Sequence, residues 1–247
     1  MKIPKLLIGA PGVGKTASIR SQYEHCEVLL LSSCTEEDIA GLPYREDNKE
    51  RRTMPPFIER IREAVKNKKK TCLFLDEMDK ARREVADTLL TLITHPQHFG
   101  ISEEVDIVAA ANPPEWGGGD GISQPMLTRF AVINYKPNVE KWAEITLKEF
   151  SHVPFVFKLV ERISNGEIPL LESVGEGLDF RLTSPRTWHL AIHAMQNKEY
   201  ELIAGLLTPN AGTALLSMAE KQRGRIEEVQ EISRQIGSTK IRNTLRI

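Results

Sequence analysis

Residues 9–16, GAPGVGKT, decide the fold of this chain because they fit the pattern G-x-x-x-x-G-K-[ST] without a mismatch. They follow the apolar run KLLI, residues 5–8, and precede a helical pattern that begins at Lys15. A glycine-rich loop between a buried strand and a helix lets successive backbone N–H groups point inward, where the helix N-terminus adds positive potential. The sequence therefore predicts a phosphate-binding loop at the end of its first strand.

The eight residues of this loop are predicted to contact the phosphates of a bound nucleotide. The glycines let the backbone curl, Lys15 would bridge the β- and γ-phosphates of ATP, and the Thr16 hydroxyl would bind Mg²⁺. The alternative interpretation, a glycine turn that merely joins a strand to a helix, does not require a Lys-Thr pair at this offset. The predicted nucleotide-binding residues are Gly9, Ala10, Pro11, Gly12, Val13, Gly14, Lys15 and Thr16.

A second apolar run, LFLDE at residues 73–77, ends in two adjacent acids. A buried strand beside the phosphate-binding loop would bring Asp76 to the Mg²⁺ shell, together with Thr16, and Glu77 to a water molecule aligned on the γ-phosphate. The alternative is that the two acids, with Asp79 close behind, cap the following helix. Next to the predicted loop we favour the catalytic interpretation, with Asp76 as a nucleotide and metal ligand and Glu77 as a catalytic residue.

The run AAANPP, residues 109–114, places a polar residue at the end of a third apolar segment. Ligands of open α/β sheets bind beyond the carboxyl ends of the strands, and Asn112 stands at such an end. A neutral amide there can orient the attacking water, which makes Asn112 a candidate catalytic residue. The alternative is an ordinary Asn-Pro turn.

Two arginines late in the chain are candidates for stabilising the charge that develops on a transferred phosphoryl group. Arg129 lies in MLTRF, immediately before the fifth predicted strand, and Arg186 lies in SPRTW at the start of a predicted helix. A guanidinium in this role accelerates hydrolysis by roughly 10³–10⁵-fold. For either arginine considered alone, a surface ion pair is the alternative.

The distribution of apolar segments predicts an α/β fold. Five short β-rich segments are continuous rather than alternating in their apolar residues and are separated by helical patterns, which indicates a buried parallel sheet flanked by helices. The predicted strands are Lys5–Ile8, Val28–Leu31, Thr71–Leu75, Ile107–Ala111 and Val132–Tyr135.

After Pro137 the strand signals stop and helical patterns continue to about residue 235. We therefore predict two domains, an α/β nucleotide-binding domain over residues 1–136 and a small all-helical domain over residues 137–247. In the second domain Ser184 supplies a helix N-cap, and Trp188 begins an apolar stripe that is expected to be core.

The overall composition carries no strong charge signal, since 33 basic and 34 acidic residues leave a formal net charge of −1. Three cysteines at unrelated spacings, Cys26, Cys34 and Cys72, favour a reducing compartment over a disulfide framework. No run reaches the ~18 apolar residues that span a bilayer, and Pro4 and Gly9 interrupt the apolar N-terminal stretch. We therefore predict a cytoplasmic protein that does not enter a membrane.

In their order along the chain, these motifs resemble those of the AAA+ ATPases, and specifically of the MoxR-like branch. The resemblance covers nearly the whole chain, and the ordered set is more specific than any one motif. It identifies residues 9–16 as Walker A, 73–77 as Walker B, 109–114 as sensor 1, 127–130 (LTRF) as the arginine-finger region, 183–188 (TSPRTW) as sensor 2, and 35–43 (TEEDIAGLP) as a stretch typical of the branch.

The resemblance implies a sheet with strand order 5-1-4-3-2, a helical lid, and a homo-oligomeric ring, usually of six subunits, with ATP and Mg²⁺ bound between neighbours. It also implies that Arg129 reaches the site of the next subunit and that Arg186 couples the lid to its own nucleotide. The family further suggests a separate protein partner with a von Willebrand A type metal-binding domain.

The leading functional hypothesis is therefore an ATP-hydrolysing, MoxR-like remodelling protein that acts on a separate partner. One alternative is a DNA-directed AAA+ factor of the replication or helicase-loading type, because basic residues outnumber acids over residues 45–70; charge runs of this kind are usually solvated, so nucleic acid is not favoured. A second alternative is a nucleotide-gated scaffold with slow turnover. Attack by water suits the Asp-Glu pair better than transfer to a substrate hydroxyl, which disfavours a small-molecule kinase.

Two weaker features receive no catalytic role. His189 and His193 stand four residues apart on a predicted helix, but no glutamate follows His189 and the sequence indicates no third metal ligand. They are interpreted as helix-surface or domain-contact histidines. The glycine loop EWGGGDG, residues 115–121, lacks a Lys-Thr pair and is assigned to no motif.

Overall fold

The structure is a computed structural model that describes residues 2–116, 122–176, 180–218 and 220. The chain divides into two compact units, Met1–Lys136 and Pro137–Ile247, here called unit 1 and unit 2. The division lies at the point where the strand-rich pattern of the sequence ends.

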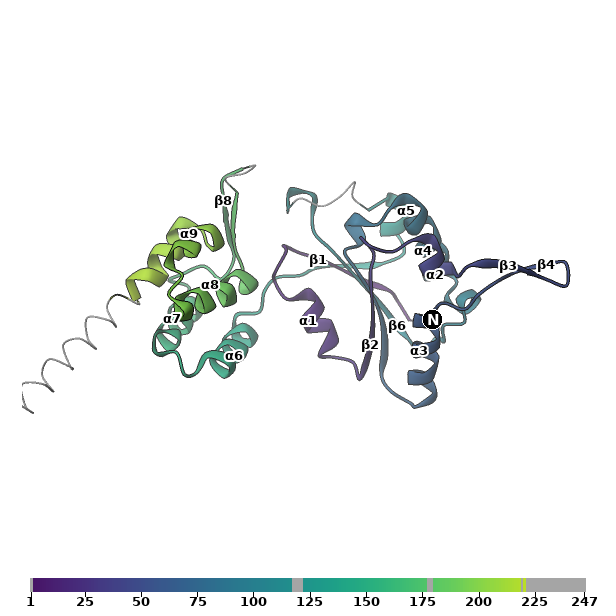
Figure 1. Ribbon diagram of the computed structural model, residues 1–247, viewed down its shortest axis with the longest axis horizontal. Coiled ribbons are helices and arrows are strands. Elements are labelled where there is room, and N and C mark those ends of the chain that lie inside the picture. The colour runs from purple at the N-terminus through teal and green to yellow at the C-terminus, as the bar shows by residue number, and fades with distance from the viewer. Residues whose placement is uncertain (1, 117–121, 177–179, 219, 221–247) are drawn as a thin grey trace, which may run out of the picture. The chain divides into compact units, whose positions relative to one another are not determined.

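Unit 1 is built on a sheet of five parallel strands (Figure 1). The strand order is β2-β5-β6-β1-β7. Numbered only among themselves, the five strands run 2-3-4-1-5, which is 5-1-4-3-2 read from the other edge. The labels differ because β3 and β4 form a hairpin outside this sheet. The strands are β1 (Lys5–Ile8), β2 (His25–Leu30), β5 (Thr71–Asp76), β6 (Asp106–Ala111) and β7 (Ala131–Asn134).

The start of β2 differs most from the prediction, because the strand begins at His25 rather than Val28. Its first residues are polar, yet they pair with β5 in register from His25 opposite Thr71. Glu27 can lie buried in this strand because the Arg60 guanidinium donates to both of its carboxylate oxygens, with Nε–O distances of 3.1 and 3.0 Å. The ion pair between Glu27 and Arg60 thus stabilises a polar first half of β2, which the pattern of apolar residues does not predict.

Both faces of the sheet are buried, as the continuous apolar strands predicted. Along β5, Leu73 and Leu75 belong to the cluster formed with helices α2, α3 and α4, while Phe74 belongs to the opposite cluster, with Ile19 of α1. Each such buried side chain contributes ~1.5–3 kcal/mol relative to its exposed state. The helices are α1 (Lys15–Arg20), α2 (Glu36–Ala40), α3 (Pro56–Lys66), α4 (Arg83–Thr94) and α5 (Gln124–Leu127). The predicted five-stranded α/β fold is confirmed.

A hairpin that the sequence analysis did not predict joins α2 to α3 (Figure 1). Its antiparallel strands are β3 (Pro43–Glu46) and β4 (Lys49–Arg52), and all eight of their residues are exposed. Asp47 and Asn48 form the turn with φ values of 51° and 56°, the left-handed conformation that tight hairpin turns require. With neither face buried, the hairpin has no apolar alternation from which to predict it.

Unit 2 is mainly helical but contains a second antiparallel hairpin, so the prediction of an all-helical domain is wrong. Its strands are three residues each, β8 (Glu172–Val174) and β9 (Arg181–Thr183), too short to carry a detectable period. Polar contacts hold the hairpin, because the Thr208 hydroxyl bonds both the Thr183 hydroxyl, at 3.0 Å, and the Glu172 carboxylate. The helices are α6 (Val139–Phe150), α7 (Pro154–Ser164), α8 (Pro185–Asn197), α9 (Ile203–Leu206) and a helical segment over residues 209–218.

Trp188 is fully buried at the centre of the apolar core of unit 2, as its place in the predicted stripe suggested. Ser184 caps α8 as predicted, since its side chain accepts from the backbone N–H of Thr187. Among the described residues, no helix is both long enough and apolar enough to cross a membrane. Short 3₁₀ turns occupy Met78–Lys80, Pro96–Phe99, Pro114–Trp116 and Tyr200–Leu202.

Candidate nucleotide-binding site

The loop of residues 9–16 connects β1 to α1, and two of its glycines are required for different reasons. A Cβ on Gly9 would lie 2.3 Å from the backbone oxygen of Tyr135, closer than real Cβ atoms approach any atom. Gly14 caps α1 with φ 93°, a backbone conformation that side chains make strained. Ala10 and Val13 are buried, whereas Pro11 and Gly12 are partly exposed. The loop therefore packs closely against the sheet on one side and curls tightly at its other end.

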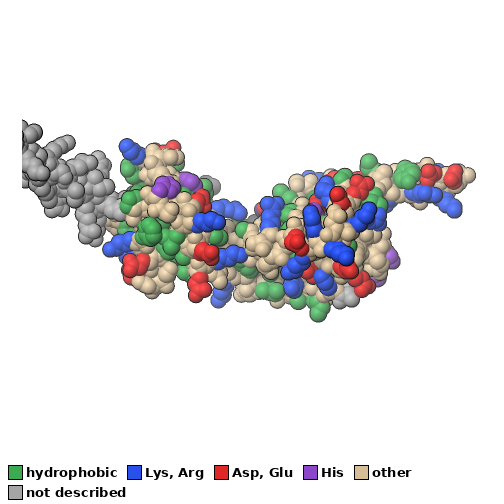
Figure 2. Space-filling model, turned by 90° about the horizontal axis from the view of Figure 1, so that it is seen from below, with side chains coloured by type: hydrophobic (Ala, Val, Ile, Leu, Met, Phe, Trp, Pro, Cys, Tyr) green, Lys and Arg blue, Asp and Glu red, His purple; other side chains and the backbone are tan. Residues whose placement is uncertain are grey.

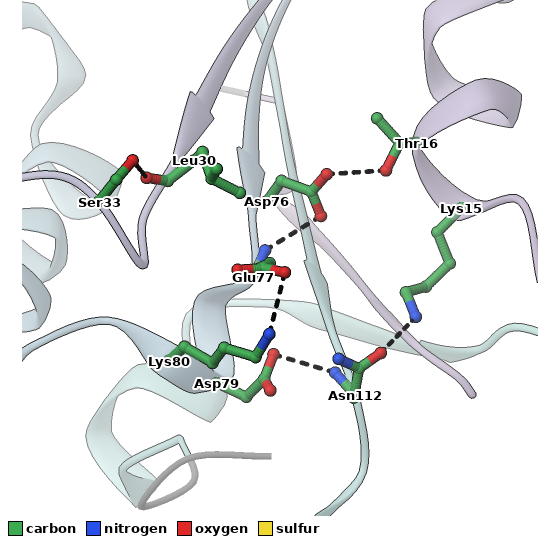
Figure 3. A network of polar contacts seen from close by, with 9 residues as sticks. All are labelled: Lys15, Thr16, Leu30, Ser33, Asp76, Glu77, Asp79, Lys80 and Asn112. Carbon is green, nitrogen blue, oxygen red and sulfur yellow. Dashed lines mark hydrogen bonds and ion pairs between the residues drawn. The ribbon is translucent and has the colours of Figure 1, made fainter. Parts of the chain in front are cut away.

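The Lys15 side chain is buried inside this loop and joins it to the end of β6. Its Nζ donates to the backbone oxygens of Gly9 at 2.6 Å and Ala10 at 3.0 Å. It also donates to Asn112 Oδ1 at 2.9 Å (Figure 3). An ammonium carries three N–H donors, and these acceptors compensate for its burial. A phosphate oxygen presents the same kind of acceptor, so the group is suited to binding one in their place.

Thr16 and Asp76 form a second link, between α1 and the end of β5. The Thr16 hydroxyl donates to Asp76 Oδ2 at 2.7 Å, and Asp76 Oδ1 accepts from the backbone N–H of Glu77 at 3.0 Å (Figure 3). A hydroxyl beside a carboxylate is an oxygen donor set that fits Mg²⁺, which typically takes one or two protein ligands and completes its shell with phosphate and water. Within the described ranges, no group of three or more His, Cys, Asp or Glu side chains is arranged to hold a metal by itself.

Glu77 has an unusual backbone conformation at the end of β5. Its φ is 56° and its ψ 46°, which places a non-glycine residue in the left-handed region at a cost of about 1–3 kcal/mol. The side chain is partly buried, and its Oε1 accepts from Lys80 Nζ at 3.0 Å. Because Glu77 directly follows Asp76, the last residue of β5, both residues lie at the same edge of the sheet (Figure 3).

Asn112 lies immediately after β6, and its contacts reveal a residue to which the sequence analysis gave no catalytic role. Its side-chain oxygen accepts from Lys15, while its backbone N–H donates to Asp79 Oδ1 at 3.0 Å (Figure 3). The Asp79 side chain is buried, with 3% of the residue exposed. Its sequence signal was an acid two residues after Glu77, which the sequence analysis mentioned only beside the helix-cap alternative for Asp76 and Glu77.

Arg129 does not join this network in the structure. Arg129 is exposed, and its guanidinium donates to Thr128 Oγ1 at 2.9 Å and to the backbone oxygen of Pro125 at 3.3 Å, both in its own segment. Arg186 is exposed in the first turn of α8 in unit 2. Their assigned roles remain predictions.

The histidines of unit 2 belong to a contact between α6 and α8. His189 Nδ1 and His193 Nε2 each lie 3.6 Å from a carboxylate oxygen of Glu149, and the Thr146 hydroxyl lies 2.9 Å from His189 Nε2. Burial lowers the pKa of His189, opposed by the charge of Glu149 and reinforced by His193. Of the unassigned glycine loop, residues 117–121 lie outside the described residues.

A phosphate-binding loop after β1, an acidic pair after β5 and an asparagine after β6, on a parallel sheet of this order, together define a P-loop nucleotide-binding protein of the AAA+ class. The model of the AAA domain (dynein-related subfamily) matches residues 4–130, more than half of the 247 residues. The chain belongs to this family.

Comparison with solved structures finds the Thermotoga maritima RuvB Holliday junction branch migration motor, with 16% sequence identity and a TM-score of 0.44. Two variants of the same RuvB protein, each with a single substitution, give the same identity and TM-score. The match to the motor covers 87% of this chain but 61% of the RuvB chain, so this chain spans about three fifths of the length of that structure. No curated protein matches the sequence.

Proposed function

We propose that this chain binds ATP with Mg²⁺ and hydrolyses it. The observation that carries this proposal is the network at one edge of the sheet, where Lys15 bonds Asn112 and Thr16 bonds Asp76. These four side chains come from the ends of three different elements, and each is of the type that the proposed role requires. Membership of the AAA family supports the same reaction.

Each residue has a proposed role in this reaction. The loop N–H groups and Lys15 bind the phosphates, and Thr16 and Asp76 hold Mg²⁺, which neutralises the charge developing on the phosphate oxygens. Glu77 accepts a proton from the attacking water, and Asn112 orients that water. The ion pair between Glu77 and Lys80 is partly exposed to solvent, so Glu77 can exchange this contact for one with water.

We further propose that the protein works as a MoxR-like remodelling ATPase in a homo-oligomeric ring. The exposed position of Arg129 supports this, because a guanidinium that bonds its own surface segment is accessible to the nucleotide of an adjacent copy. Arg186 would couple unit 2 to the nucleotide. The partner would be a separate protein, for which a von Willebrand A domain is the candidate that the motif resemblance suggests.

The DNA-directed alternative gains no support from the basic stretch of residues 45–70. In the hairpin, Arg51 pairs with Glu46 at 2.8 Å and Arg52 with Glu36 at 3.3 Å. Lys70 lies over the ring of Tyr23, 4.9 Å from its centroid. Figure 2 likewise shows acidic and basic side chains interspersed over one face of unit 1. Acidic side chains thus pair with arginines of this stretch whose charge a phosphate backbone would need.

Steady-state phosphate release tests the proposed reaction directly. Glu77→Gln should lower the turnover number by about 100-fold or more while ATP still binds, because the general base is lost and the phosphate ligands remain. Glu63→Gln, which neutralises an exposed acid on α3, is the matched control and should leave turnover unchanged. If wild type and Glu77→Gln release phosphate at the same rate, the protein is a slow nucleotide-gated scaffold instead.

The same variant can be used to identify the partner protein. Glu77→Gln held in ATP should retain a bound partner protein, which affinity capture would identify. Stimulation of wild-type turnover by DNA at low salt, lost as salt is raised, would favour the DNA-directed alternative.

A further inference from the structure

Asp79 occupies the 3₁₀ turn after β5, and the direction of its side chain needs an explanation. The turn is closed by backbone bonds, from Lys80 N–H to the oxygen of Glu77 at 3.0 Å and from Ala81 N–H to Met78 at 3.4 Å. The Asp79 carboxylate contributes to neither bond. It accepts instead from Asn112, which is 33 residues away in the chain.

The backbone N–H of Asn112 lies beyond the hydrogen-bonded ladders of the sheet. The pairing of β6 with β5 ends at Leu75 opposite Ala109, and its pairing with β1 ends at Ile8 opposite Ala111. A buried N–H without an acceptor is costly, and Asp79 supplies the acceptor that no strand provides. The Asp79 side chain thus supplies one hydrogen bond beyond the end of the sheet, to the backbone of the residue whose side-chain amide is predicted to be catalytic.

Burying a carboxylate for one backbone hydrogen bond is an expensive arrangement. Asp79 is almost fully buried, since 3% of the residue is exposed, and its Oδ2 has no hydrogen-bond partner among the described residues. A group retained at such a cost beside a candidate active site is more readily explained by the geometry that it imposes than by stability.

We propose that Asp79 is a positioning residue for Asn112, a proposal that rests on the function proposed above. Asn112 is held at two points, its backbone by Asp79 and its side chain by Lys15. When a phosphate replaces Asn112 as the acceptor for the Lys15 ammonium, the bond from the Asn112 backbone to Asp79 remains. It keeps the side-chain amide of Asn112 directed at the site. Loss of Asp79 therefore lowers turnover by letting Asn112 rotate, whereas the loop that binds ATP is unaffected.

A double-mutant cycle in the full chain tests whether Asp79 acts through Asn112. Asp79→Ala should lower kcat by roughly 10–100-fold, the effect of misplacing a catalytic group, with the Kd for ATP unchanged. Asp79→Asn keeps an oxygen acceptor and should stay within about threefold of wild type. The double variant Asp79→Ala with Asn112→Ala should be no slower than Asn112→Ala alone.

Hydrogen exchange of the Asn112 amide gives a readout that does not depend on activity. The backbone N–H of Asn112 should exchange slowly in wild type and Asp79→Asn, and markedly faster in Asp79→Ala. If wild type lacks ATPase activity, the proposed function fails, but this measurement still decides whether Asp79 holds Asn112.

Three results would overturn the inference. These are equal protection of the Asn112 amide in Asp79→Ala and wild type, multiplicative losses of kcat in the double variant, and a weakened ATP Kd that accounts for the lost activity. Should Asp79→Ala fail to fold, Asp79→Asn decides alone, because a turnover as low as that of Asn112→Ala would contradict the proposed role.

Discussion

The candidate site has two parts, and they differ in whether contacts within one chain hold their side chains in place. Lys15, Thr16, Asp76 and Asn112 bond one another at the edge of one sheet, with distances of 2.7 Å for the Thr16–Asp76 pair and 2.9 Å for the Lys15–Asn112 pair. Arg129 belongs to the same unit, yet it is exposed and bonds its own segment.

The difference follows from what holds each side chain in place. The first four residues stand at or next to the ends of strands and a helix whose packing brings them together, so their arrangement costs little at the moment of binding. Arg129 has a long side chain on an exposed residue, and its guanidinium donates to acceptors in its own segment. A single chain thus holds the four residues of the candidate phosphate site together, whereas in the proposed function Arg129 would stabilise the developing charge at the site of an adjacent copy.

The largest effect is expected in the preformed part. Lys15→Ala should weaken ATP binding by roughly 100-fold or more, because Lys15 would donate to both the β- and γ-phosphates, each charge-assisted hydrogen bond contributes about 1.5–3 kcal/mol, and each 1.4 kcal/mol is tenfold in affinity. Calorimetric titration with ATP measures it, and Lys66→Ala, at an exposed lysine, is the control. An unchanged Kd would mean that the network is not the nucleotide site.

Arg129→Ala tests the other part. It should bind ATP with the wild-type Kd but hydrolyse it up to about 10³-fold more slowly, because the guanidinium acts on developing charge rather than on bound nucleotide. Mixing it with Lys15→Ala should restore part of the activity, since each variant supplies what the other lacks. If mixed rings form, as shown by pull-down of a tagged variant, and activity stays absent, Arg129 does not act between subunits.

A pair of glycine substitutions sharpens the account of the preformed loop. Gly9→Ala should lower the free energy of unfolding by about 1–3 kcal/mol, because the new Cβ meets a backbone oxygen that cannot move aside. A Cβ on Gly14 would have no non-neighbouring atom within 4 Å, so Gly14→Ala should lower the free energy of unfolding by about 1 kcal/mol through its positive φ alone. Urea unfolding compares the two, and an equal or smaller loss for Gly9→Ala would remove the packing argument.

The smallest expected effect lies in unit 2. Burial lowers the pKa of His189, so the folded unit favours the neutral ring more than the unfolded chain does. The stabilisation is complete above the unfolded pKa of about 6.5 and is lost as the pH falls below it. The melting temperature should therefore drop less between about pH 7.5 and 5.5 in His189→Gln than in wild type, with the exposed His193→Gln as the comparison. An identical drop in His189→Gln and wild type would exclude His189 as the cause.

Several parts of this protein could be predicted from local sequence. GAPGVGKT between an apolar run and a helical pattern indicated both the fold class and the phosphate-binding loop, because the offset of Lys15 and Thr16 from the glycines is itself the chemical requirement. Asp76 and Asn112 could be placed because the ends of parallel strands meet at one edge of a sheet. These inferences needed only neighbours along the chain.

What the tertiary structure decided depends on contacts between distant residues or on elements without an apolar period. The β3–β4 and β8–β9 hairpins were missed because their strands are exposed or three residues long. Asp79 received no role of its own from the sequence, whereas folding brings its carboxylate to the N–H of Asn112. The sequence alone therefore determined which groups could bind a triphosphate, whereas the fold decided which of them hold one another in place, because such bonds require chain segments that only packing brings together.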